Sequence, residues 1–170
     1  WEHSLKDWEW VVGVNLMGVA HGVRVFTPMM VEAAKTDPSY EGHIVNTASM
    51  AGLLNAPNMG VYNVTKHAVV AMSETLYQDL RLVTDQIGAS VLCPFFVPTG
   101  IHQSQRNRPA EMQESDVRPT KSQLIAQALT EGSRLVSLFG RRVGAANSSA
   151  NGAEEVVTTA VLQREGGPLS

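Results

Sequence analysis

The sequence is poor in the residues that mark several common kinds of site. Its 170 residues contain one cysteine, Cys93, which excludes an intramolecular disulfide and a cysteine-rich zinc site. The five histidines show no HxxxH or HExxH spacing, so we expect no metal site. A lone cysteine in the apolar run SVLCPFF is typical of a buried strand residue in a reducing compartment. We therefore expect a cytoplasmic location.

Charge of one sign and long apolar runs are also scarce. Thirteen Lys and Arg against sixteen Asp and Glu give a net charge of −3, and the basic cluster Arg141 and Arg142 is only a pair. Nucleic acid is therefore not an expected partner. Apolar residues make up 44% of the chain and the mean hydropathy is −0.06, which predicts a globular domain and no membrane span. No leader-like segment is present, and because the chain starts at Trp1 on a helix signal, we expect that a segment precedes it.

Hydrophobic periodicity predicts alternating helices and strands. Ser4, with Asp7 three residues later, is a capping signal for a long helix over residues 5 to about 33, whose last turns Pro28 should kink or limit. Two apolar runs, HIVNTAS and GASVLCPFFV, read as buried strands, and a second helix spans residues 61 to about 81 between them. This order predicts parallel strands in an α/β fold.

The pattern loosens after Pro98. We expect a polar loop up to residue 120, a short helix over residues 121–132, and a last helix from Glu154 to about Arg164. No convincing strand appears in residues 133–170, and we expect this tail to be partly disordered.

Three polar side chains should converge at the end of the first strand. Tyr62 and Lys66 lie one helical turn apart, and Ser49 at the carboxyl end of the strand can meet them. A phenol is a poor base at neutral pH, but a nearby ammonium stabilises the phenolate, so Tyr62 could exchange a proton with an oxygen that Ser49 holds. Asn15 falls on the apolar face of the first helix, where a buried amide needs partners.

In this order the motifs resemble the short-chain dehydrogenase/reductase family, classical type. The segments NLMGVAHGVR, HIVNTASMAG, VYNVTKHAV and VLCPFFVPT are similar to four of its motifs, over roughly residues 1–130. The resemblance implies a Rossmann-like, doubly wound parallel sheet of which the N-terminal half is missing here. Residues 1–132 would then be the C-terminal half of that domain, and residues 133–170 a divergent tail.

The resemblance also implies roles. Tyr62 would be the catalytic acid/base, Ser49 would orient the substrate, Lys66 would assist Tyr62 and hold the nicotinamide ribose, and Asn15 would maintain a water that relays protons to Lys66. The cofactor, NAD or NADP, would have further contacts with Pro94, Val97 and Thr99. The implied reaction is hydride exchange with an alcohol or ketone. Family members commonly pair through the two long helices, so we expect a homodimer or homotetramer.

The sequence also departs from the family. Its TGxxxGxG turn, its cofactor-selecting residue and its NNAG strand are absent, and Phe95 replaces the usual glycine after the strand-end proline. We therefore expect no hydride transfer from these 170 residues alone. An apolar substrate is expected from a crevice lined by Met50, Leu54, Met59, Phe95 and Phe96. Two alternatives stay open: a sugar-nucleotide epimerase or dehydratase, as in the extended relatives, and a non-catalytic chain that only pairs with another subunit.

Overall fold

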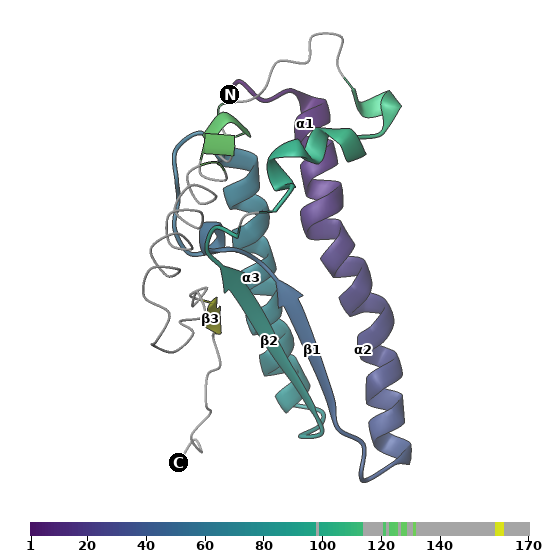
Figure 1. Cartoon of the computed structure of the whole chain (residues 1–170). Helices are drawn as coiled ribbons and strands as arrows, with labels where there is room; N and C mark the ends of the chain where they lie inside the picture. Colours follow the sequence, from purple (N-terminus) through teal and green to yellow (C-terminus); the bar gives the residue numbers. More distant parts are fainter. Residues whose placement is uncertain are drawn as a thin grey trace, which may run out of the picture. The chain divides into compact units, whose positions relative to one another are not determined.

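The computed structural model describes residues 1–97, 99–113, 121, 123–125, 127–128, 131 and 159–161. These residues fall into two compact units. The first comprises residues 1–94 with the short strand at 159–161, and carries the sheet and the long helices (Figure 1). The second comprises the described part of residues 95–158.

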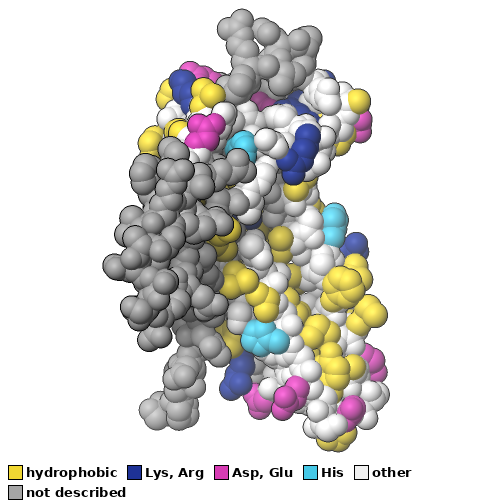
Figure 2. Space-filling model, viewed as in Figure 1, with side chains coloured by type: hydrophobic (Ala, Val, Ile, Leu, Met, Phe, Trp, Pro, Cys, Tyr) yellow, Lys and Arg dark blue, Asp and Glu magenta, His cyan; other side chains and the backbone are white. Residues whose placement is uncertain are grey.

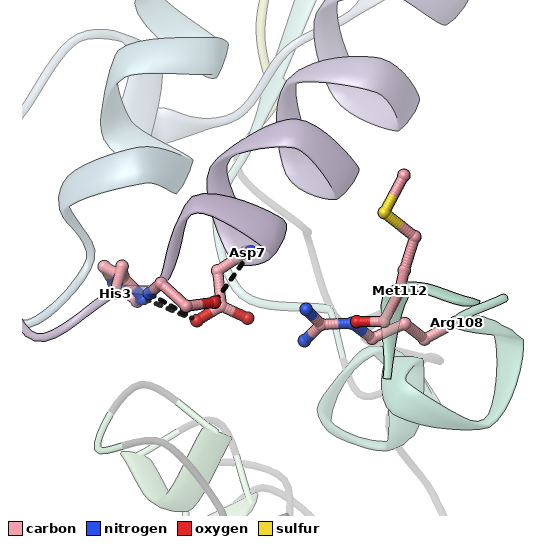
Figure 3. A network of polar contacts seen from close by, with 5 residues as sticks. His3, Asp7, Arg108 and Met112 are labelled. Carbon is pink, nitrogen blue, oxygen red and sulfur yellow. Dashed lines mark hydrogen bonds and ion pairs between the residues drawn. The ribbon is translucent and has the colours of Figure 1, made fainter. Parts of the chain in front are cut away.

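The first helix begins where the sequence predicts, because its N-terminus is capped in both directions. Ser4 Oγ accepts the Asp7 N–H at 3.1 Å, and Asp7 Oδ2 accepts the Ser4 N–H at 3.0 Å. This capping box satisfies backbone donors that a helix start leaves open. The Asp7 carboxylate also lies 3.8 Å from His3 Nδ1, an ion pair when the imidazole is protonated (Figure 3).

Helical structure then runs without a break to residue 36 in three segments. These are α1 (Leu5–Val11), a π-helical segment η1 (Val12–Met17) and α2 (Gly18–Thr36). The predicted helix over residues 5–33 is confirmed and extends three residues further. Pro28 lies inside α2 and does not end it.

A strand, a helix and a strand follow at the predicted places, but the prediction that both strands are buried is wrong for the first, in which only Asn46 is buried. The strands β1 (Gly42–Thr47) and β2 (Ile87–Pro94) are parallel, and α3 (Gly60–Arg81) connects them (Figure 1). On β2 the buried residues alternate, so every second side chain enters the core. Cys93 is one of them and is 0% exposed, which confirms the prediction of a buried strand residue.

The end of the chain differs from expectation. The strand β3 (Thr159–Val161) pairs antiparallel with the end of β2, where Pro94 lies opposite Thr159. The predicted helix from Glu154 to about Arg164 is therefore wrong at these residues, as is the expectation of no strand in the tail. The reason is that β2 supplies the partner, and a long-range pairing leaves no trace in local periodicity.

The second unit replaces part of the expected polar loop with short helices. The 3₁₀ helices η3 (Ile101–Asn107) and η4 (Ala110–Met112) lie within residues that the sequence predicted as loop. Arg108 Nε donates to the Met112 carbonyl oxygen at 2.8 Å (Figure 3). The described residues between 121 and 131 are helical, as predicted.

Two apolar clusters make up the core of the first unit. One joins α2, α3 and the start of β2, and consists of Ala34, Leu76, Leu80, Ile87 and Ala89. The other lies near the carboxyl ends of the parallel strands, and consists of Ala48, Val69, Val70, Val91 and Cys93. The second cluster supports the residues that the sequence analysis singled out, because Ala48 directly precedes Ser49. None of the helices in the described ranges is long and apolar enough to cross a membrane.

The outer side of β1 is open. Among the described strands the order is β1-β2-β3, so β1 is an edge strand. Beside it runs a groove of about 510 Å³, the β1-edge groove, lined by Val14, Gly18, Val19, Gly22, Val23, Phe26, Met30 and residues 43–47. Figure 2 shows hydrophobic side chains gathered along α2. A Cβ placed on Gly13 or Gly22 would meet nothing within 4 Å, so the described part of the chain leaves space beside both glycines.

Candidate functional site

The π-helical segment η1 holds the first candidate residue, Asn15. Its amide Nδ2 donates to Thr65 Oγ1 of α3 at 3.3 Å. Thr65 Oγ1 in turn donates to the carbonyl oxygen of Tyr62 at 2.9 Å. Asn15 is half-buried and not buried as predicted, and its amide finds a partner in the hydroxyl of Thr65, a residue that is 0% exposed.

Ser49 sits where β1 ends and the short 3₁₀ helix η2 (Met50–Gly52) begins. Its backbone is extended, and its Oγ accepts the N–H of Ala51 at 3.1 Å as the N-cap of η2. That bond uses a lone pair of the hydroxyl and not its proton. The Ser49 backbone N–H donates a hydrogen bond to the Cys93 thiol, which ties this turn to β2.

The turn after β1 packs directly on α3. A Cβ on the buried Gly52 would lie 2.7 Å from the Lys66 carbonyl oxygen and 2.9 Å from the Lys66 carbonyl carbon. Only a residue without a side chain fits against the helix backbone at this distance. Gly52 therefore fixes how closely the Ser49 turn approaches the helix that carries Tyr62 and Lys66.

Lys66 and Tyr62 come together on one face of α3, as the spacing predicts. The Lys66 Nζ lies 5.7 Å from the centroid of the Tyr62 ring and donates to the Thr47 carbonyl oxygen at 3.1 Å. This carbonyl is at the end of β1, so the amine bridges the strand end and the helix. Burial lowers the pKa of Lys66.

Cys93 is a buried residue of β2 next to the Ser49 turn. Burial raises the pKa of its thiol, and the hydrogen bond from the Ser49 backbone opposes that rise. The thiol is thus a buried neighbour of the turn and not an exposed nucleophile. Within the part of the chain that the structure describes, no group of three or more His, Cys, Asp or Glu side chains could hold a metal ion.

The residues predicted to line an apolar pocket lie in different settings. Met50 packs on the second core cluster, and Leu54 is 64% exposed. The loop that carries Leu54 and Met59 is held to α3, because Asn63 Nδ2 donates to the Ala56 carbonyl oxygen at 2.9 Å.

The remaining predicted residues follow β2. Pro94 ends the strand, and Phe95, Phe96, Val97 and Thr99 belong to the second unit. Phe95 is 69% exposed, and Thr99 Oγ1 accepts the N–H of Ile101 at 3.3 Å. Pro98 lies outside the described residues.

Comparison with known proteins places this chain in a family. The sequence profile of the short chain dehydrogenase family matches residues 1–110. The chain belongs to this family. One solved relative is a short-chain dehydrogenase/reductase from Burkholderia phymatum in complex with NAD. Its sequence is 53% identical to this chain, and the two structures superpose with a TM-score of 0.68. The match covers 77% of this chain and 44% of that chain.

Two further relatives carry names of activities. The CLA biosynthesis dehydrogenase/reductase of Lactiplantibacillus plantarum is 33% identical over 78% of this chain and 43% of its own length. The C alpha-dehydrogenase of a Sphingobium species is 33% identical over 64% of this chain and 33% of its own length. The chain thus spans less than half the length of each of these three short-chain dehydrogenases. The Rossmann-like α/β fold implied by the sequence agrees with the solved relative.

Three residues that contact the candidate site of this short-chain dehydrogenase are not predicted by the sequence. Thr47 contributes a backbone carbonyl, which no residue type reveals. Gly52 was not distinguished from an ordinary turn glycine, because its close approach to α3 depends on the fold. Thr65 falls at a core position of the helix, where a buried hydroxyl must find hydrogen-bond partners, and this requirement is the signal that could have identified it.

Proposed function

We propose that this chain carries the proton-transfer residues of an oxidoreductase that interconverts an alcohol and a carbonyl compound with NAD or NADP. The observation that carries the proposal is the placement of Lys66, whose amine is held at the end of β1 and lies 5.7 Å from the Tyr62 ring. An ammonium in a partly desolvated position acts strongly on a neighbouring phenol, because little water screens its charge.

The residues present fit the nicotinamide end of such a cofactor. The Lys66 ammonium has three N–H donors, and one of them goes to the Thr47 carbonyl, so donors remain for the hydroxyls of a ribose. No glycine-rich phosphate turn of the family pattern occurs in the sequence, so these residues supply only part of a cofactor site. The Burkholderia phymatum relative was solved with NAD, which supports NAD as the first cofactor to test.

Each residue then has one task. The bound nicotinamide would supply or accept the hydride. Tyr62 takes the proton of the alcohol oxygen in the oxidation and returns it to the carbonyl oxygen in the reduction. Ser49 donates its free hydroxyl proton to the same oxygen and so holds the substrate against Tyr62. Lys66 stabilises the phenolate and binds the ribose, and Asn15 stands at the start of a path for protons toward Lys66.

The substrate expected for this site is an apolar alcohol or ketone. Support comes from the exposed Leu54 on the loop next to α3, and from the half-buried Met59 on the same loop. Both side chains lie within ten residues of Ser49 and Tyr62 in the sequence. A panel of alcohols of increasing chain length, compared by kcat/KM, tests this point.

The central experiment uses a chimaera, because the chain lacks a phosphate turn. The matched part of this chain replaces the matched 44% of the Burkholderia phymatum protein. In this chimaera Tyr62→Phe should lower kcat about 100-fold or more, because it removes the proton donor and keeps the ring. Binding of NADH, followed by fluorescence, should change little.

A matched control is available in the same helix. Tyr77→Phe makes the same chemical change, but Tyr77 packs on the first core cluster, away from Lys66. Its kcat should stay within about twofold of the parent. A Tyr62→Phe chimaera that keeps most of its kcat would refute the proposed role of Tyr62.

A further inference from the structure

The hydroxyl of Thr65 connects two elements that the proposed reaction needs. It lies on α3, three residues after Tyr62 and directly before Lys66, and it contacts Asn15 of the π-helical segment η1. The residue is 0% exposed, so its hydroxyl is shielded from bulk solvent. The structure thus links Asn15 to the backbone of the tyrosine through one buried oxygen.

The direction of these hydrogen bonds is determined by the chemistry of a hydroxyl. Thr65 has one hydroxyl proton, and the Tyr62 carbonyl, 2.9 Å away, can only accept it. Toward Asn15 the Thr65 oxygen can therefore only accept, so Asn15 must present its NH₂ group at 3.3 Å. The amide carbonyl of Asn15 then points away from Thr65. A threonine at this position thus selects one of the two possible orientations of the Asn15 amide.

We infer that Thr65 is a positioning residue, whose hydroxyl fixes the orientation of the Asn15 amide and ties η1 to α3 beside Tyr62. The inference rests on the proposed function, in which Asn15 starts the proton path. Thr65 itself contacts neither substrate nor cofactor. Its effect on the reaction comes through the amide that it orients and through the backbone of Tyr62.

The same chain contains a second relay of this kind, which serves as a control. Asn46 Nδ2 of β1 donates to Ser73 Oγ at 3.0 Å, and Ser73 Oγ donates to the Val69 carbonyl oxygen at 2.7 Å. Both Asn46 and Ser73 are buried. These two bonds also join an asparagine to the backbone of α3 through a hydroxyl. Ser73 lies about two helical turns after Thr65 on α3, and none of the proposed site residues takes part.

The experiment measures pH–rate profiles of the chimaera described above. Thr65→Val keeps the branched shape and removes the hydroxyl, so kcat should fall about tenfold and the profile should move to higher pH, while KM for the cofactor stays unchanged. Thr65→Ser keeps the hydroxyl and should restore both. Ser73→Ala should lower thermal stability and leave the profile in place.

A double-mutant cycle identifies the partner. Asn15→Ala and Thr65→Val should each lower kcat, and the double variant should be no slower than Asn15→Ala alone, because both changes remove the same oriented amide. If Thr65→Val does not fold, Thr65→Ala takes its place in the cycle. An unchanged pH profile in the folded variant, or losses that multiply in the double variant, would overturn the inference.

These outcomes remain distinct from a failure of the proposed function. Tyr62→Phe is assayed in the same preparation. If Tyr62→Phe is inactive and Thr65→Val behaves like the parent, only the role of Thr65 is refuted. If Tyr62→Phe retains its activity, the proposed function itself is refuted, and the effect of Thr65→Val on kcat carries no weight.

Discussion

Replacing Gly52 by alanine tests how closely the Ser49 turn must approach α3. The added methyl would lie 2.7 Å and 2.9 Å from the carbonyl oxygen and carbon of Lys66, and 3.0 Å from Val70 Cγ2. Two of these neighbours are backbone atoms in the middle of a helix, which cannot rotate away as a side chain could. The turn itself must therefore move.

The loss of folding stability caused by this displacement can be estimated. Adding one methyl to a tightly packed position typically destabilises a protein by about 1–3 kcal/mol. For a protein of this size that corresponds to a fall in Tm of about 2–4 °C for each kcal/mol. Because the turn carries Ser49, kcat should also fall, with the cofactor KM changed less than kcat.

Gly60→Ala is the matched control. Gly60 is the first residue of α3, and a Cβ there would meet nothing within 4 Å. Alanine at such a position reduces the freedom of the unfolded chain and should stabilise the protein by about 0.4–1 kcal/mol. The two substitutions should thus change the free energy of unfolding of the chimaera, measured by urea denaturation, in opposite directions. A Gly52→Ala variant as stable as the parent would refute the close packing of the turn on Lys66.

Two further predictions concern Lys66 and the chain on its own. Burial lowers the pKa of Lys66 below its ordinary 10.5, so between the folded and unfolded pKa values the unfolded chain binds more protons and stability rises with pH. Lys66→Met removes this effect. The free energy of unfolding of the variant minus that of the parent should therefore be greatest near neutral pH and should decline as the pH approaches 10.5. A difference in unfolding free energy that does not vary with pH would contradict this prediction. The 170-residue chain alone should give no Tyr62-dependent change in nicotinamide absorbance with alcohols or ketones, since it lacks a phosphate turn; steady turnover would show the reverse.

Local patterns in the sequence were sufficient for the parts of the fold that depend on neighbouring residues. The capping signal at Ser4 located the start of the first helix, and the spacing of Tyr62 and Lys66 placed both on one face of α3. The two apolar runs identified β1 and β2, since a short run rich in β-branched and apolar residues is typical of a strand.

The parts that depend on distant contacts could not be predicted in this way. The strand at Thr159–Val161 exists through its pairing with β2, and a three-residue segment has no period of its own. The packing of Gly52 on Lys66 joins two elements through a turn whose course the sequence does not reveal. The π-helical geometry around Asn15 was also missed, because apolar residues on either side of it still recur at nearly helical spacing.

The π-helical geometry of η1 means that this helix contains one residue more than an α-helix of the same length would. In a π-helical segment the hydrogen bonds reach from residue i to i+5, so η1 contains one residue more than an α-helical turn of the same extent. Deleting one residue between 12 and 17 would allow ordinary α-helical bonding. Because the wide turn already absorbs that extra residue, α1 and α2 would keep nearly the same orientation, and only the wide turn that contains Asn15 would be lost. In an alignment of relatives, a one-residue gap at this place therefore predicts a helix that is α-helical throughout, with an unchanged course on either side of the gap.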